Sequence, residues 1–147
     1  MKKKKSRIGV VNEEFWKRIL PIFLSWGFEK HPIEFGRDDY GYHYQFVDSR
    51  NKSDVRLVWF VIFSRDCSLS IRGLKNVSID PNVEKVPSIG GNEKDAFILT
   101  RPLSLRHIFD VSFRLEQKRD EPLEAAAARL IEDVIKELPR LKRFLYG

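Results

Sequence analysis

The chain has 147 residues, enough for one domain with a sizeable hydrophobic core. Its 42% hydrophobic and 12% aromatic content excludes a disordered chain. The formal charge is +6, and five of the 27 basic residues lie at the start: Lys2, Lys3, Lys4, Lys5 and Arg7. The rest of the chain has 22 basic against 21 acidic residues, which weakens the case for a nucleic-acid-binding face on the folded body.

We expect residues 1–7 to form a basic, disordered tail and residues 8–147 to form a single domain. No apolar segment of signal-peptide length follows the basic start, and the other apolar runs are too short to span a membrane. The single cysteine, Cys67, allows no disulfide within the chain and no cysteine-based metal site. These features predict a cytoplasmic protein without a membrane partner.

The first predicted element is an amphipathic helix that begins after Asn12, a suitable capping residue. Its apolar side chains recur at helical spacing: Phe15, Trp16, Ile19, Leu20, Phe23 and Leu24. Pro21 removes one hydrogen-bond donor, so we expect a kink or a break there. Gly27 is suited to the left-handed conformation that ends a helix.

A run of strands separated by polar turns follows, which predicts an antiparallel meander. A short strand is expected over 33–37, and alternation over 40–47 places Tyr40, Tyr42, Tyr44 and Phe46 on one face. The central strand, 57–63, has seven consecutive apolar residues, which predicts burial on both faces. Another alternating strand is predicted over 68–74.

The second half of the chain is less regular until its final helix. Residues 76–95 predict a long surface loop, and 96–100 a brief strand that stops before Pro102. The alternation of 109–116 favours a strand, with a helix as the alternative over 105–116. The last helix is predicted to have Asp120 as its cap, Pro122 in its first turn and a kink or break at Pro139. Its apolar seam consists of Leu123, Ala127, Leu130, Val134, Leu138, Leu141 and Leu145.

Catalytic and metal-binding patterns are weak. His31, His43 and His107 lie far apart, and none has a cysteine or carboxylate at metal-ligand spacing. The glycine-rich stretch at 88–92 lacks a P-loop lysine pattern and reads as a flexible turn. We therefore expect a non-enzymatic protein with no metal and no cofactor.

The tyrosine-rich strand is the main candidate binding feature. Tyr40, Tyr42 and Tyr44 are candidate partner-binding residues, because tyrosines often anchor protein interfaces. The alternative is that these rings pack beneath a helix as core. A second hypothesis is a nucleic-acid-associated protein that uses exposed tyrosines and two basic clusters. These clusters are the tail and the C-terminal basic residues: Lys2, Lys3, Lys4, Lys5, Arg140, Lys142 and Arg143.

Two short stretches, Leu24-Ser25-Trp26-Gly27-Phe28 and Leu138-Pro139-Arg140-Leu141, close a first and a last helix on either side of a predicted sheet. This layout resembles small bacterial domain-of-unknown-function proteins that often occur near polymorphic toxins and resemble immunity proteins. The resemblance implies an α+β fold and no established active site, so it assigns a role to no residue. The basic tail and the long loop over 76–95 depart from the layout.

Together these observations predict an α+β fold, in which an antiparallel sheet of about five strands packs against an N-terminal helix and a long C-terminal helix. With both helices on one face, the other face would be under-covered. The leading functional hypothesis is a protein-binding module, resembling an immunity or accessory protein. It would bind a protein partner, or itself as a homodimer, through the open sheet face.

Overall fold

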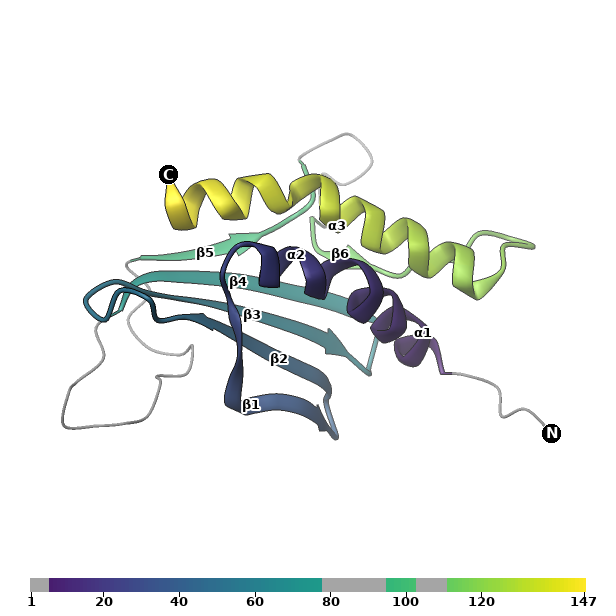
Figure 1. The fold of residues 1–147 in the computed structure, drawn as a ribbon. Coiled ribbons are helices and arrows are strands. Elements are labelled where there is room, and N and C mark those ends of the chain that lie inside the picture. The colour runs from purple at the N-terminus through teal and green to yellow at the C-terminus, as the bar shows by residue number, and fades with distance from the viewer. Residues whose placement is uncertain (1–5, 78–94, 103–110) are drawn as a thin grey trace.

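An antiparallel six-stranded sheet and two helical segments make up the fold in this computed structural model (Figure 1). The structure describes residues 6–77, 95–102 and 111–147. The strand order is β1-β2-β3-β4-β5, and β6 also pairs with β4. The described helices lie over the same face of the sheet (Figure 1). The predicted α+β fold is therefore confirmed, with one strand more than expected.

The N-terminal helical segment consists of α1 (Arg7–Glu14), a π-helical turn η1 (Phe15–Ile19) and α2 (Leu20–Ser25). Its cap is Ser6, whose side chain accepts a hydrogen bond of 3.1 Å from the N–H of Gly9. The predicted start after Asn12 is therefore wrong by more than one turn. Residues 6 and 7 were predicted to belong to the tail, but Ser6 caps α1 and Arg7 is its first residue. Residues 1–5 lie outside the described residues.

The predicted irregularity near Pro21 takes the form of the π-helical turn immediately before α2. Proline has no N–H for the regular helical ladder, so a local change of hydrogen-bond pattern is expected beside it. The end of α2 agrees with the prediction, because Gly27 adopts a left-handed conformation with φ of 101°.

The predicted three-stranded meander is confirmed as β2 (Gly41–Asp48), β3 (Val55–Phe63) and β4 (Ser68–Val77), and β1 (Glu29–Asp38) extends it to four strands. The register pairs Tyr44 with Phe60 and Phe60 with Ile71, so these three side chains share one face. That face lies beneath the helices, because all three belong to the main core cluster.

The first strand is longer than predicted, 29–38 instead of 33–37, and its register shifts at a bulge between Lys30 and Phe35. His31 shapes this bulge. Its ring atom Nδ1 accepts hydrogen bonds from the backbone N–H groups of Ile33, at 3.1 Å, and Glu34, at 3.0 Å. Four residues, 31–34, thereby face a single residue of β2, Gln45.

Two short strands share the outer edge of β4: β5 (Ala96–Leu99) and β6 (Phe113–Arg114). The backbone N–H of Arg101 donates to the carbonyl of Val111 over 2.7 Å, which joins the two segments just beyond β5. The predicted strand over 109–116 is thus present at 113–114. Residues 103–110, with His107, and residues 78–94 of the predicted loop lie outside the described residues.

The C-terminal helix α3 (Leu123–Tyr146) is one continuous helix, so of the kink or break expected at Pro139 the break is wrong. The apolar seam stays buried on both sides of the proline, at Leu138 and Leu141, and this packing holds the helix together across the missing hydrogen bond. The predicted start is also corrected. Pro122 takes the capping position, while Asp120, with φ of 61°, lies in the turn before it.

The core fills the space between the helices and the sheet. Phe15 stacks on Tyr44 at 4.7 Å between ring centroids and contacts Phe60 at 4.4 Å. The helix α3 approaches the sheet closely at Gly73, where a Cβ atom would lie 2.7 Å from Cδ1 of Leu141. Because a fully buried aromatic side chain contributes roughly 1.5–3 kcal/mol, this layer supplies much of the stability.

Candidate functional site

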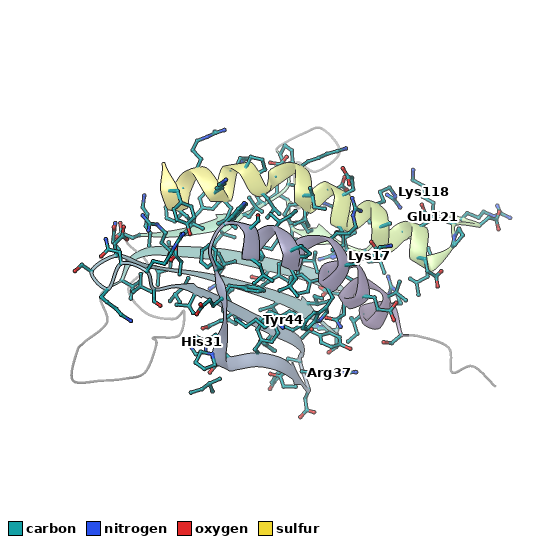
Figure 2. The ribbon with its side chains drawn as sticks, viewed as in Figure 1. Lys17, His31, Arg37, Tyr44, Lys118 and Glu121 are labelled. Atoms are coloured by element: carbon teal, nitrogen blue, oxygen red, sulfur yellow. The ribbon has the colours of Figure 1, made fainter. Side chains whose placement is uncertain are left out.

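The tyrosines predicted as one binding face occupy three different environments. Tyr44 is 3% exposed, beneath the N-terminal helix (Figure 2). Its hydroxyl accepts a 3.1 Å hydrogen bond from Nε1 of Trp16 and donates to Oδ1 of Asn12, while burial raises its pKa. Tyr44 therefore belongs to the core, which corrects its assignment to a partner-binding surface.

Tyr42 and Tyr40 lie progressively further from the core. Tyr42 is half-buried and has the guanidinium carbon of Arg37 5.2 Å from its ring centroid. Tyr40 is 73% exposed, in the turn between β1 and β2. Its N–H donates to Oδ1 of Asp38 over 2.8 Å, and its carbonyl accepts from the N–H of Ser64, also over 2.8 Å. Of these three tyrosines, only Tyr40 is thus largely exposed.

The face of the sheet opposite the helices, which we call the outer face, holds the best candidate site. Its centre carries six side chains that keep at least partial exposure: His43, Trp59, Phe63, Ser70, Arg72 and Ile98. We call this set the outer-face patch. Cross-strand register places Trp59, Arg72 and Ile98 in one row, on β3, β4 and β5.

Trp59 is the centre of this patch. The guanidinium carbon of Arg72 lies 5.6 Å from the Trp59 ring centroid, and the His43 ring stacks on the tryptophan at 6.2 Å. These contacts come from the strands on either side, so they hold the ring upright on the sheet. The expectation that the central strand is buried on both faces is confirmed at Leu57 and Val61, and it holds only in part at Trp59 and Phe63, which are half-buried.

Two hollows of about 420 Å³ each flank the patch. One lies on β1 and β2 and is lined by Ile33, Gly36 and His43 among others. The other lies where β4 meets β5, with Phe63, Ser70 and Ile98 in its wall. His43 lines the first hollow, and Phe63, Ser70 and Ile98 line the second, so both hollows adjoin the patch.

Of the described residues, His31, His43 and Cys67 do not form a site together. His31 is buried in the β1 bulge, His43 pairs with Asp38 at 3.0 Å, and His107 lies outside the described residues. Within residues 6–77, 95–102 and 111–147, no group of three or more His, Cys, Asp or Glu could hold a metal ion. Burial of Cys67 raises its pKa to about 11, so its sulfur stays a thiol at neutral pH. None of the helices in the described ranges is long and apolar enough to cross a membrane.

The C-terminal basic residues are all exposed, but two of them have contacts within their own chain. Arg140 pairs with Glu137 at 2.9 Å and donates to the carbonyl of Thr100 over 3.1 Å. Lys142 lies over the Trp26 ring at 5.8 Å, and Arg143 is exposed. The tail residues Lys2, Lys3, Lys4 and Lys5 lie outside the described residues. Two of the three C-terminal cations thus already contact groups of their own chain.

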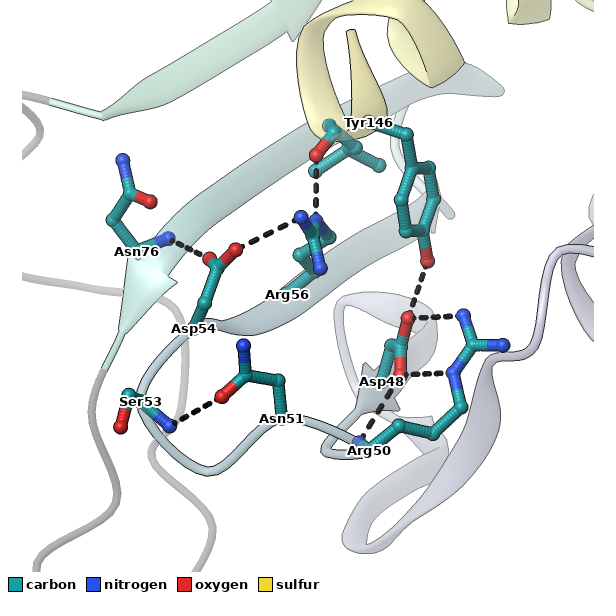
Figure 3. Close-up of polar contacts among 9 residues, drawn as sticks. Asp48, Arg50, Asn51, Ser53, Asp54, Arg56, Asn76 and Tyr146 are labelled. Atoms are coloured by element: carbon teal, nitrogen blue, oxygen red, sulfur yellow. Dashed lines mark hydrogen bonds and ion pairs between the residues drawn. The ribbon is translucent and has the colours of Figure 1, made fainter.

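A polar network that the sequence did not reveal fixes the end of α3 (Figure 3). Both carboxylate oxygens of Asp48 accept hydrogen bonds from the Arg50 guanidinium, at 2.8 and 2.6 Å, and the Tyr146 hydroxyl donates to one of them over 2.6 Å. The bonds from Arg50, and then that from Tyr146, lower the pKa of Asp48 to about 2, although burial opposes them. Burial and the neighbouring carboxylate raise the pKa of Tyr146, so its hydroxyl keeps its proton.

Arg56 extends this network to the helix backbone (Figure 3). Its Nε donates to the carbonyl of Leu145 over 2.6 Å, and its guanidinium pairs with Asp54 at 2.8 Å. The same guanidinium lies 4.5 Å from the Tyr146 ring centroid. Because these polar groups are engaged with one another, the network acts as a structural clamp rather than as a binding site.

Comparison with known proteins adds no assignment. No protein-family model matches the chain, and neither a curated protein nor a solved structure matches it. The assignment of the outer-face patch as the candidate site therefore rests on its geometry. Sequence reasoning anticipated an under-covered sheet face but named the tyrosines instead of Trp59, Arg72 and Ile98, because alternation alone does not say which face the helices cover.

Proposed function

We propose that this protein is a non-enzymatic protein-binding module that binds its partner through the outer-face patch. The observation that carries the proposal is Trp59, a large aromatic side chain that stays only half-buried in the middle of a sheet. Tryptophan and arginine are among the residues most often found at the energetic centres of protein interfaces. The row of Trp59, Arg72 and Ile98 combines these residue types with an exposed aliphatic side chain.

The resemblance to immunity proteins suggests one class of partner, a protein toxin. The body of the chain is nearly neutral, so it is a poor electrostatic decoy for a nuclease that binds nucleic acid. We therefore expect the affinity to come from apolar and aromatic contacts across the patch and not from mimicry of nucleic acid. A cytoplasmic site of action remains our proposal, in keeping with a single buried cysteine.

The nucleic-acid hypothesis has less support from the geometry. Stacking on bases requires an aromatic ring with an accessible face. Arg72 and His43 contact Trp59 from the two neighbouring strands, so a base would have to displace one of them. Tyr44 is buried, and Arg140 is paired with Glu137, which removes two of the residues that this hypothesis needs.

The test is a comparative capture experiment with a matched control. Wild-type protein, Trp59→Ala and Leu24→Ala would be used as baits, Leu24 being 45% exposed on α2, on the helix side. We expect a partner that the wild type and Leu24→Ala retain and that Trp59→Ala loses. Calorimetry with the purified partner should show affinity weakened at least about tenfold, equivalent to about 1.4 kcal/mol.

Thermal melts of all three baits establish that each is folded. If Trp59→Ala is too unstable, Ile98→Arg at the rim of the patch takes its place, with Leu24→Arg as its control. A partner that both patch variants bind as strongly as the wild type does would contradict the proposal. A toxin encoded beside the gene is the first purified candidate to examine.

A further inference from the structure

The strand β1 is the outermost strand at one edge of the sheet (Figure 1). Among the strands of the described residues it pairs only with β2, and eight of its ten residues are exposed. A strand that is paired on one side only presents backbone N–H and C=O groups on the other side, and a further strand can bind them. The addition of an extended peptide to such an edge is a recurring mode of protein recognition.

We propose that the free edge of β1 binds an extended, acidic segment of a partner protein as an additional antiparallel strand. The backbone groups of Phe35 and Arg37 bind the segment, and Lys30 and Arg37 attract its acidic side chains. None of these residues belongs to the outer-face patch, so this surface is a second one and the inference does not depend on the proposed function.

The turn between β1 and β2 determines which backbone groups of β1 point outward. Two residues that close a hairpin turn of two residues exchange a pair of backbone hydrogen bonds, and along the strand such residues alternate with residues that bond to the other side. Asp38 and Gly41 close the turn here, so Asp38 and Gly36 bond to β2. Phe35 and Arg37 therefore direct their N–H and C=O groups to the free edge.

The bulge limits the free edge to a short stretch. The N–H groups of Ile33 and Glu34 already donate to Nδ1 of His31, and Pro32 has no N–H. Bulges and prolines are features by which proteins protect an edge strand from pairing along its whole length. The edge of β1 is therefore open over 35–38 and closed before it.

The hollow of about 420 Å³ on β1 lies along this open stretch. Six consecutive residues, 33–38, line it together with His43. Because successive side chains of a strand point to opposite faces, a hollow lined by a continuous run of residues lies at the edge of the sheet. Gly36 keeps the hollow open, since a Cβ atom added there would meet nothing within 4 Å. An added strand has room here.

On the helix side, the edge combines aromatic rings with two cations. Nζ of Lys30 lies 4.6 Å from the ring centroid of Trp16 and 5.4 Å from that of Phe35. The guanidinium carbon of Arg37 lies 5.2 Å from the Tyr42 ring centroid.

These contacts leave both charges available. Among the described residues, neither Lys30 nor Arg37 has a carboxylate partner, and both are exposed. In an antiparallel pair, residues opposite each other place their side chains on the same face. The residues of the partner strand that face Phe35 and Arg37 therefore lie on the helix side, where acidic side chains would be attracted to the two cations.

A second β1 strand is a poorer occupant of the edge. In an antiparallel pair of β1 strands, Phe35 and Arg37 would have to face outward-directed residues of the other copy. A pair centred on Arg37 brings two guanidinium groups together, and a pair centred on Gly36 sets Glu34 opposite Asp38, where like charges repel. A pair centred on Phe35 sets Arg37 opposite the bulge, whose N–H groups are already used.

Peptide binding, measured by fluorescence anisotropy, tests the proposal. The probe is a short labelled peptide of alternating glutamate and valine, and the control peptide has lysine in place of glutamate. We expect the glutamate peptide to bind and the lysine peptide to bind at least about tenfold more weakly. N-methylation of the glutamates removes the N–H groups that face Phe35 and Arg37 and should abolish binding. N-methylation of the valines is the matched control and should not, because their N–H groups point away from β1.

Variants of Arg37 separate the backbone from the charge. Arg37→Ala removes only the cation, whereas Arg37→Pro removes the outward N–H as well. Proline is tolerated on an edge strand where the missing N–H faces solvent. We expect the dissociation constant for the glutamate peptide to rise about tenfold in Arg37→Ala and at least about tenfold further in Arg37→Pro. Trp59→Ala, on the outer face, should bind the peptide like the wild type, and thermal melts show that each variant is folded.

Amide hydrogen exchange of the wild type detects the contact without any substitution. In the free protein, the amides of Phe35 and Arg37 should exchange faster than those of Gly36 and Asp38, which bond to β2. A saturating amount of the glutamate peptide should slow exchange at Phe35 and Arg37 at least about tenfold and leave Gly36 and Asp38 nearly unchanged.

The outcomes separate this inference from the proposed function. No binding of the glutamate peptide overturns the inference, as does binding that leaves the Phe35 and Arg37 amides unprotected or that treats the two N-methylated peptides alike. A wild-type dimer that Arg37→Pro abolishes would assign the edge to a second copy and would also overturn it. The capture experiment with Trp59→Ala decides the outer face independently. Selective binding of the glutamate peptide, with protection at Phe35 and Arg37, supports the added strand.

Discussion

The hydroxyl of Tyr146 donates a 2.6 Å hydrogen bond to the carboxylate of Asp48, which joins the last turn of α3 to the end of β2 (Figure 3). The two residues are 98 positions apart in the chain. The Asp48 side chain is only 2% exposed, and Arg50 neutralises its charge. Because a buried carboxylate is costly without such partners, the clamp ties the position of α3 to the ionisation of a single group.

The clamp predicts acid-sensitive stability. The pKa of Asp48 is about 2 in the folded protein, below the ordinary value of about 3.9 expected in the unfolded chain. The unfolded state therefore binds more protons, so this stabilisation is complete above about pH 4 and is lost as the pH falls toward 2. We expect a contribution on the order of 1–2 kcal/mol, reduced by the solvent that reaches Arg50.

Urea denaturation of the wild type and of Asp48→Asn between pH 2 and pH 7 measures this contribution. The asparagine variant should be less stable at pH 7, and the gap should narrow as the pH falls. Tyr146→Phe keeps the arginine pair and should cost only about 1 kcal/mol, the net value of one hydrogen bond. Equal pH profiles for the wild type and Asp48→Asn would rule out this role for the carboxylate.

Neighbouring aromatic residues of β3 should differ sharply in their effect on stability. Phe60 is fully buried beneath the helices, and its replacement by alanine should cost about 3–5 kcal/mol. Trp59 is only half-buried on the outer face, so Trp59→Ala should cost less, about 1–2 kcal/mol. Chemical denaturation measures the loss of stability in both variants. A larger loss for Trp59→Ala than for Phe60→Ala would mean that the main core lies on the outer face and not beneath the helices.

The tyrosines provide a second comparison within one segment of chain. Tyr44→Ala should destabilise the fold by about 3–5 kcal/mol, because it removes a ring stacked on Phe15. Tyr40→Ala should change stability by less than about 0.5 kcal/mol, since its ring is exposed in a turn. The melting temperatures of the two variants test this difference. Similar values for both would contradict the assignment of Tyr44 to the core.

The close approach of α3 to the sheet predicts a compensating pair. A Cβ atom on Gly73 would lie 2.7 Å from Cδ1 of Leu141, at the flexible end of that side chain. Gly73→Ala should therefore be tolerated better than Gly73→Val, which should cost about 1–3 kcal/mol by overpacking. Adding Leu141→Ala to Gly73→Val should cost less than the sum of the two single changes, because the residues compete for one space. A double-mutant cycle in urea measures this coupling, and strict additivity would argue against the contact.

The sequence by itself determined the elements whose signal is local. Alternation located the strands of the meander to within a few residues, and 3.6-residue periodicity located the α3 seam, because both patterns follow from backbone geometry. The glycine stop at Gly27 was equally visible, since a left-handed residue is needed where a helix ends. Local patterns failed where packing overrode them, as at Pro139, where a buried seam on both sides keeps the helix continuous.

Only the tertiary structure decided which strand face the helices cover and which residues meet across the chain. Alternation places Trp59 and Phe60 on opposite faces, yet burial depends on helices that are distant in sequence. For the same reason the sequence placed Tyr40 and Tyr44 on one face and left open whether that face was core or surface. The pairing of Asp48 with Tyr146 had no local signal at all, because long-range contacts are set by the packing of whole elements and leave no periodic trace in the chain.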